Sequence, residues 1–130
     1  MLSLIEITVR GFHLDVFGHV NNARILEFME EARWAIFEPA LKQMRASDHA
    51  MAIVNANINY RRVATLYQRL HVDGRIVKFS NRSFVMAQQI QCAETGQLIA
   101  DANFICVIVA NATSKAIPIT DYWRLLLQPA

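Results

Sequence analysis

The sequence predicts an α+β fold in which one curved antiparallel sheet of about five strands wraps around a long central helix. The first observation is that apolar residues alternate near the N-terminus, follow a helical period from residue 23, and alternate again from residue 50. The second is that short polar links separate the later alternating segments, as hairpin turns do. The third is that the helical segment is apolar on more than one side, which suits enclosure by a sheet.

The N-terminal part is predicted as a strand, a polar loop and a helix. Apolar residues fall near period two over residues 4–10, whereas residues 11–22 are polar and rich in His and Asn. From residue 23 to about residue 38, apolar residues recur with helical spacing. They form one stripe that we expect to be buried, which comprises Ile25, Met29, Ala32, Ile36 and Ala40.

Capping residues and a proline mark the ends of this helix. Asn21 or Asn22 is the expected N-cap, because its side chain can accept a hydrogen bond from a free N–H of the first turn. Pro39 is not tolerated deep inside a helix, so we end the long helix near Glu38 and expect a short second helix over residues 39–46.

The rest of the chain is predicted as four strands and a terminal helical turn. The strands are expected over residues 50–62, 68–79, 82–93 and 97–110. Residues 80–81 and 94–96 are expected to form hairpin turns, so that successive strands pair antiparallel. The helical turn is expected over residues 119–127, with Thr120 as its cap.

Length and composition favour one domain, residues 1–130, whose cysteines are reduced thiols. A chain of 130 residues buries roughly two thirds of its unfolded surface, so it needs neither metal nor disulfide to fold. Cys92 and Cys106 each lie in an alternating apolar run, outside any CxxC motif, and are expected to be free thiols in the core. The hydrophobic content of 54% indicates a subunit interface, an apolar ligand slot, or both.

Charge and hydropathy disfavour two classes of function. The net charge is only +2, and no run of Lys and Arg provides the basic surface of a nucleic-acid-binding protein. The longest clean apolar run, residues 104–110, is too short to span a bilayer, and the N-terminal residues lack the pattern of a signal peptide. We therefore expect a cytoplasmic protein with no nucleic-acid partner and no membrane span.

The polar loop carries the chemistry that the sequence offers. Five short polar residues precede the long helix there: His13, Asp15, His19, Asn21 and Asn22. A helix N-terminus presents unpaired N–H groups and a partial positive charge, which can hold the oxyanion formed in acyl transfer. A carboxylate beside such a site can attack the acyl carbon or activate water.

Two other interpretations of the loop stay open. Asp15 and the asparagines can simply satisfy loop backbone groups and cap the helix. His13, Asp15 and His19 can also be metal ligands, although no second ligand cluster accompanies them, and we expect no metal site.

A second polar segment ends the strand predicted over residues 50–62. It contains Asn59, Tyr60, Arg61 and Arg62. The paired arginines either form a solvated strand end or contact phosphates through charge-assisted hydrogen bonds. A ligand with phosphates and an apolar tail would use both the arginines and the apolar composition of the chain.

One long ordered pattern runs from the loop into the helix: Val9-Arg-Gly-Phe-His-Leu-Asp-Val-Phe-Gly-His-Val-Asn-Asn-Ala-Arg24, continuing as Leu26-Glu-Phe-Met-Glu-Glu-Ala-Arg-Trp34. With the later segment from Val54 to Ala64, which includes Asn-Ile-Asn-Tyr-Arg-Arg, it resembles the 4-hydroxybenzoyl-CoA thioesterase-like family of hotdog-fold proteins, and most closely its bacterial long-chain acyl-CoA thioesterases. The resemblance covers nearly the whole chain. Two positions depart from the family's pattern: Val63 stands where Pro is common, and Ile25 where an aromatic residue is common.

The resemblance implies a hotdog-fold thioesterase that hydrolyses a medium- to long-chain fatty acyl-CoA to the free acid and CoA. Asp15 matches the family's catalytic carboxylate, acting as general base or nucleophile, with N–H groups of the helix start as the oxyanion site. His19, Asn21 and Asn22 are then expected to orient substrate or water. No cofactor is implied, because the CoA thioester is itself the substrate.

The resemblance also bears on substrate binding and assembly. The residues expected at the substrate are Asn59, Tyr60, Arg61, Arg62 and Arg82. A homodimer or homotetramer is implied, with active sites between subunits. Three alternatives stay open: a non-catalytic acyl-CoA binding module, a thioesterase that acts on acyl carrier protein, and a metal-dependent hydrolase.

Overall fold

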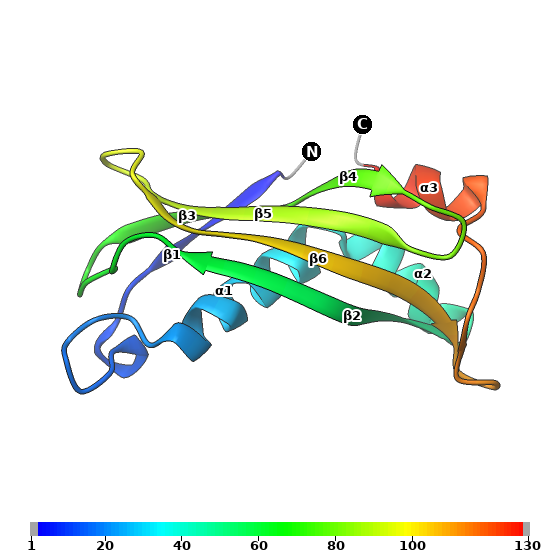
Figure 1. Ribbon diagram of the computed structural model, residues 1–130, viewed down its shortest axis with the longest axis horizontal. Helices are drawn as coiled ribbons and strands as arrows, with labels where there is room; N and C mark the ends of the chain where they lie inside the picture. Colours follow the sequence, from blue (N-terminus) through cyan, green and yellow to red (C-terminus); the bar gives the residue numbers. More distant parts are fainter. Residues whose placement is uncertain (1–2, 129–130) are drawn as a thin grey trace.

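Residues 3–128 are described by the computed structural model, in which seven strands form one antiparallel sheet that curves around a long helix (Figure 1). The strands are β1 (Leu4–Thr8), β2 (His49–Tyr60), β3 (Arg69–Asp73), β4 (Arg75–Phe79), β5 (Phe84–Cys92), β6 (Leu98–Ala110) and β7 (Lys115–Ala116). The helices are the short 3-10 helix η1 (Gly11–His13), α1 (Asn22–Ile36), α2 (Glu38–Ala46) and α3 (Asp121–Leu127). The predicted fold class is confirmed.

The strand order is β1-β3-β5-β6-β2, with β4 added beside β5 and β7 beside β6. The hairpins predicted at residues 80–81 and 94–96 join β4 to β5 and β5 to β6, as expected. The expectation that successive strands pair is wrong for β2, which pairs with β6 instead of β3. The link over residues 61–68 is longer than a tight hairpin turn, so it can carry the chain across to the opposite edge of the sheet.

The strand predicted over residues 68–79 divides into two at Gly74, and both halves pair with β5. A Cβ at Gly74 would lie 3.4 Å from Cδ1 of Ile36 and 3.4 Å from Cε2 of Phe37. The missing side chain therefore lets the C-terminal end of α1 pack closely against the break between β3 and β4.

Helix α1 packs its apolar stripe into the core, as predicted. Ile25, Met29, Ala32 and Ile36 of α1 are all buried, and so is Ala40 of α2. Pro39 lies in the first turn of α2, which begins at Glu38, one residue before the predicted start. Contacts of α1 with β1 and β3, and of α2 with β2, place both helices against the sheet.

Two smaller predictions have opposite outcomes. Cys92 and Cys106 are free and buried, as expected. Thr120 occupies the N-cap position of α3, as predicted, but its side chain makes no capping hydrogen bond, so the expected side-chain cap is absent. Among residues 3–128, no helix is both long enough and apolar enough to cross a membrane.

Candidate active site

The loop between β1 and α1 is organised by the side chain of Asp15. Its Oδ1 accepts hydrogen bonds from the backbone N–H of Phe17 at 2.8 Å and of His19 at 3.3 Å. The backbone closes the same turn, because Asp15 N donates to His19 O at 2.8 Å, and Gly18 adopts a left-handed φ of 79°. Oδ2 of Asp15 has no hydrogen-bond partner within residues 3–128, so one carboxylate oxygen holds the loop and the other is free.

The two asparagines at the helix start have different tasks. Asn21 is the N-cap of α1, and its Oδ1 accepts a 2.8 Å hydrogen bond from Ala23 N. The carbonyl of Asn21 accepts from the N–H groups of Arg24 and Ile25. Within the described chain, this leaves the backbone N–H of Asn22 as the donor of the first turn without an acceptor. Asn21 therefore builds the helix start, and Asn22 presents its free N–H.

A cavity of about 320 Å³ opens beside this helix start. Six of the predicted site residues line it: Asp15, His19, Asn22, Tyr60, Arg61 and Arg62. Its apolar wall comprises Val20, Ile25, Val63, Ala64 and Ile99. The two segments meet because Val20 N donates to Ala64 O at 2.9 Å, which joins the β1–α1 loop to the loop after β2.

The two arginines of the pocket are in different states. Nε and Nη2 of Arg61 donate to Asp101 at 2.8 and 3.4 Å, and Nδ2 of Asn59 donates to the same carboxylate at 2.9 Å. The hydrogen bond from Arg61, and then that from Asn59, lowers the pKa of Asp101, while the same contact raises the pKa of Arg61. Arg62 makes no ion pair or side-chain hydrogen bond within residues 3–128. It is therefore the cation of this pocket that is free to bind a ligand.

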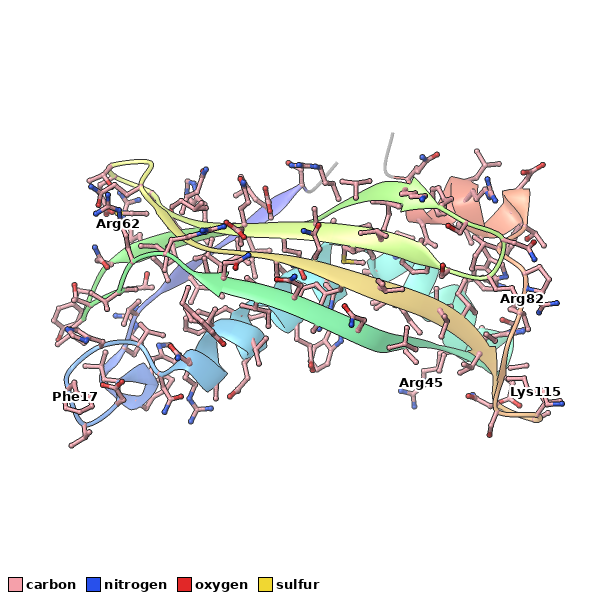
Figure 2. The ribbon with its side chains drawn as sticks, viewed as in Figure 1. Phe17, Arg45, Arg62, Arg82 and Lys115 are labelled. Atoms are coloured by element: carbon pink, nitrogen blue, oxygen red, sulfur yellow. The ribbon has the colours of Figure 1, made fainter. Side chains whose placement is uncertain are left out.

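Three predicted residues do not line the cavity. Asn21 serves as the cap, and Asn59 is bound to Asp101. Arg82 lies at the opposite end of the molecule from Phe17 and Arg62, as Figure 2 shows, and its Nη1 donates to Ala116 O at 3.1 Å. A single chain does not bring Arg82 to Asp15.

His13 belongs to another part of the surface. Its Nδ1 accepts a 2.9 Å hydrogen bond from Arg10 N, and its ring packs edge-on against Phe28. Burial, together with the charge of Arg24, lowers the pKa of His13. The ring lines a separate cavity of about 460 Å³, away from Asp15 and His19. Within residues 3–128, no three His, Cys, Asp or Glu side chains lie close enough together to hold a metal ion.

Sequence reasoning expected an apolar ligand slot but did not identify Ile99 and Ala64 as part of its wall. Ile99 comes from β6 and Ala64 from the loop after β2, and neither carries a polar group that would mark it as a site residue. Only the pairing of β2 with β6 brings Ile99 beside the loop, where its carbonyl accepts from Arg61 N at 2.8 Å. No local signal in the sequence identifies such a residue.

The arrangement combines four chemical features in one place. Asp15, with one free carboxylate oxygen, and Asn22, with a free backbone N–H, both line a small cavity that also has an apolar wall and the cation of Arg62. An N–H at a helix start can polarise a carbonyl, and a carboxylate can take a proton from water or attack the carbonyl carbon. Such a site suits acyl transfer from an amphiphilic thioester or ester.

Comparison with known proteins agrees with this chemistry. The family model of the thioesterase-like superfamily matches residues 9–123. The chain is 42% identical over 125 residues to the long-chain acyl-CoA thioesterase FadM of Escherichia coli (strain K12), and the match covers 95% of each chain.

Solved structures show the same relationship. The probable thioesterase YbaW from Escherichia coli superposes with a TM-score of 0.90 at 40% identity, covering 98% of this chain and 97% of that chain. The 1,4-dihydroxy-2-naphthoyl-CoA thioesterase Slr0204 from Synechocystis superposes with a TM-score of 0.83 at 26% identity, covering 96% and 94%. The chain therefore belongs to the thioesterase-like superfamily, as a hotdog-fold thioester hydrolase.

Proposed function

We propose that this protein hydrolyses the thioester of a medium- to long-chain fatty acyl-CoA, with Asp15 as general base or nucleophile. The observation that carries the proposal is that Asp15, whose Oδ2 is free, and Asn22, whose backbone N–H has no acceptor within residues 3–128, line the same cavity. The similarity to an enzyme described as a long-chain acyl-CoA thioesterase supports the choice of substrate class.

The proposed reaction follows from these two groups. The thioester carbonyl oxygen accepts a hydrogen bond from Asn22 N–H, and the charge at the start of α1 stabilises the oxyanion. Asp15 takes a proton from water as the water oxygen bonds to the carbonyl carbon, or bonds to that carbon itself to form an anhydride that water then opens. The carbon–sulfur bond breaks, and the CoA thiolate leaves and takes up the proton.

The remaining pocket residues are assigned to the substrate. The acyl chain enters along the apolar wall that includes Ile25 and Ile99, and His19 and the side chain of Asn22 orient substrate or water. Arg62 contacts a phosphate of CoA, because its guanidinium is not committed to a carboxylate, whereas that of Arg61 is. The proposal needs no cofactor, and the cytoplasmic location expected from the sequence stays a prediction.

A homodimer or homotetramer is part of the proposal, and strand β2 supports it. Its 12 residues pair with β6 on one side, and its other side pairs with no strand within residues 3–128. Ile53 and Val54 of this edge are exposed, at 38% and 61%. A long edge with apolar side chains normally needs a cover, and a second copy of the chain would provide it. Light scattering on the wild type and on Val54→Lys tests this, since the charge should shift the protein towards monomers.

The catalytic proposal is tested by Asp15→Asn, which keeps Oδ1 as the loop acceptor and replaces the reactive oxygen with an amide. In this variant, release of free CoA thiol from acyl-CoA substrates of graded length should fall by about two to four orders of magnitude, and so should release of the carrier's own thiol from acyl carrier protein carrying the same chains. Asp121→Asn, on the remote helix α3, is the matched control and should retain full activity. Undiminished hydrolysis by Asp15→Asn would refute the role of Asp15.

A further inference from the structure

The end of the molecule that holds the active-site cavity also exposes a group of large apolar side chains. We call it the end patch, and it comprises Val16, Phe17, Val63, Leu66 and Tyr67. Their exposed fractions are 91%, 80%, 58%, 41% and 69%. Side chains of this size are seldom left so open in groups, and a contiguous exposed apolar group marks an interaction surface.

Backbone hydrogen bonds place the two contributing loops side by side. Val20 N donates to Ala64 O at 2.9 Å, and Tyr67 N donates to Val9 O at the same distance. Val16 and Phe17 lie at the tip of the turn closed by Asp15, so their side chains project outward instead of into the core. The end patch is therefore a protruding surface made from two adjoining loops.

The geometry of this end gives no internal reason for its apolar character. The turn depends on the Asp15 carboxylate and on the left-handed φ of Gly18, and polar residues at positions 16 and 17 would satisfy it equally. Tyr67 adopts a left-handed φ of 68°, which is unfavourable for a bulky residue. Its side chain is nevertheless exposed to solvent, so core packing does not compensate for this conformation. Contact with a partner accounts for both features.

The charges beside the end patch indicate which partner. Arg10 and Arg62 form no ion pair within residues 3–128, and Figure 2 shows Arg62 at the same end as Phe17. Protruding apolar side chains beside unpaired arginines fit the surface of a membrane that contains anionic phospholipid. The apolar groups enter the boundary between headgroups and acyl chains, and the guanidinium of Arg10 contacts lipid phosphates, whereas that of Arg62 stays assigned to the substrate.

We propose that the end patch docks reversibly on anionic lipid surfaces, with Val16 and Phe17 inserted and Arg10 close to the lipid phosphates. The mouth of the Asp15 cavity then faces the lipid, because Arg62 and Val63 line the cavity and belong to the same end. Uptake of a fatty acyl thioester from the membrane would follow, and that consequence rests on the proposed function. Docking itself does not depend on it.

Sedimentation with lipid vesicles tests the docking. Wild type should sediment with mixed phosphatidylcholine and phosphatidylglycerol vesicles and much less with pure phosphatidylcholine vesicles. The double variant Val16→Ser/Phe17→Ser should lower the affinity for the mixed vesicles by about tenfold, and Arg10→Glu should also lower it. Leu125→Ser is the matched control, because Leu125 is 75% exposed on α3 yet lies outside the end patch, and its binding should equal that of wild type.

A fluorescent probe shows whether the loop tip enters the lipid. Because both native cysteines are buried, Val16→Cys and Leu125→Cys can each be labelled with an environment-sensitive dye. Mixed vesicles should shift the emission of the dye at position 16 to the blue and leave that at position 125 unchanged. Equal binding by the double variant, or a dye at position 16 already shielded by a second copy without vesicles, would overturn the proposal. Asp15→Asn should bind vesicles normally, which separates docking from catalysis.

Discussion

Arg33 of α1 and Gln88 of β5 lie 55 positions apart in the sequence and meet in the core, where Nη1 of Arg33 donates a 2.9 Å hydrogen bond to Oε1 of Gln88. Both side chains are buried, and burial lowers the pKa of Arg33. Nε2 of Gln88 donates to Met29 O at 3.0 Å and to Asp73 O at 2.8 Å, so one amide joins α1 to β3 and β5. This network holds helix α1 against the sheet.

Replacing Gln88 by Leu should destabilise the protein by about 2 to 3 kcal/mol, because it leaves a buried guanidinium without its acceptor and removes the two hydrogen bonds to carbonyl oxygens. Urea unfolding measures the loss. The double variant Arg33→Met/Gln88→Leu should lose less free energy of unfolding than the two single variants lose in sum, because removing both partners leaves neither of them buried and unpaired. Strict additivity would mean that Arg33 and Gln88 are not coupled.

Because Asn21 caps α1 and Asn22 lines the pocket, replacing each by Ala should have a different effect on stability and activity. Asn21→Ala removes the cap acceptor of Ala23 N and should lower the free energy of unfolding by about 1 kcal/mol. Asn22→Ala should leave stability nearly unchanged, because its side chain makes no hydrogen bond within residues 3–128, but should lower kcat by about tenfold through the lost amide in the pocket. Thermal unfolding and thiol release are measured on both variants. Equal losses of stability would contradict the assignment of Asn21, and not Asn22, as the helix cap.

The cluster around Asp101 predicts a pH-dependent contribution to stability. Hydrogen bonds from Arg61 and Asn59 lower the folded-state pKa of Asp101, so its contribution is present above the unfolded value of about 4 and is lost as the pH falls through the folded value. Asp101→Asn should therefore cost about 0.5 to 1 kcal/mol at pH 7, allowing for the partial exposure of Arg61, and nothing once the pH lies well below the folded value. Unfolding curves across this range test it; a pH-independent difference would exclude the ionic origin.

The unequal commitment of the two arginines predicts unequal effects on substrate binding. Arg62→Ala should raise KM for acyl-CoA by about fivefold, with a smaller effect at high salt, because a free guanidinium near a phosphate is lost. Arg61→Ala should change KM less, since Arg61 is bound to Asp101. Initial rates at two salt concentrations are the measurement. A larger effect of Arg61→Ala would mean that this side chain leaves Asp101 when substrate binds.

The two thiols should be unreactive in the folded protein. Burial raises the pKa of Cys106 to about 11, and Cys92 is also buried. At pH 8 the thiolate fraction of Cys106 is then on the order of one in a thousand, and its access to reagent is blocked. A disulfide reagent should titrate no thiol in the native state and both cysteines in urea. Rapid reaction of a native thiol would show that a core strand opens.

Much of the fold follows from local pattern. The periods of two and of 3.6 placed each long strand and the central helix, and Pro39 placed the break between α1 and α2 to within a residue or two. The pairing of β2 with β6 could not be predicted. A loop over residues 61–68 allows β2 to pair with β3 or with a more distant strand, and the apolar pattern of β6 does not indicate which strand lies beside it.

The candidate site, too, could be predicted from the sequence only in part. By itself, the sequence determined which chemical groups are present in the loop, since Asp15, His19, Asn21 and Asn22 lie within eight positions and their nature does not depend on the fold. Only the tertiary structure decided their roles: which asparagine caps, which arginine stays free, and that Ile99 lines the pocket while Arg82 does not. The reason is physical, because each role depends on which donors and acceptors from distant parts of the chain have already found partners.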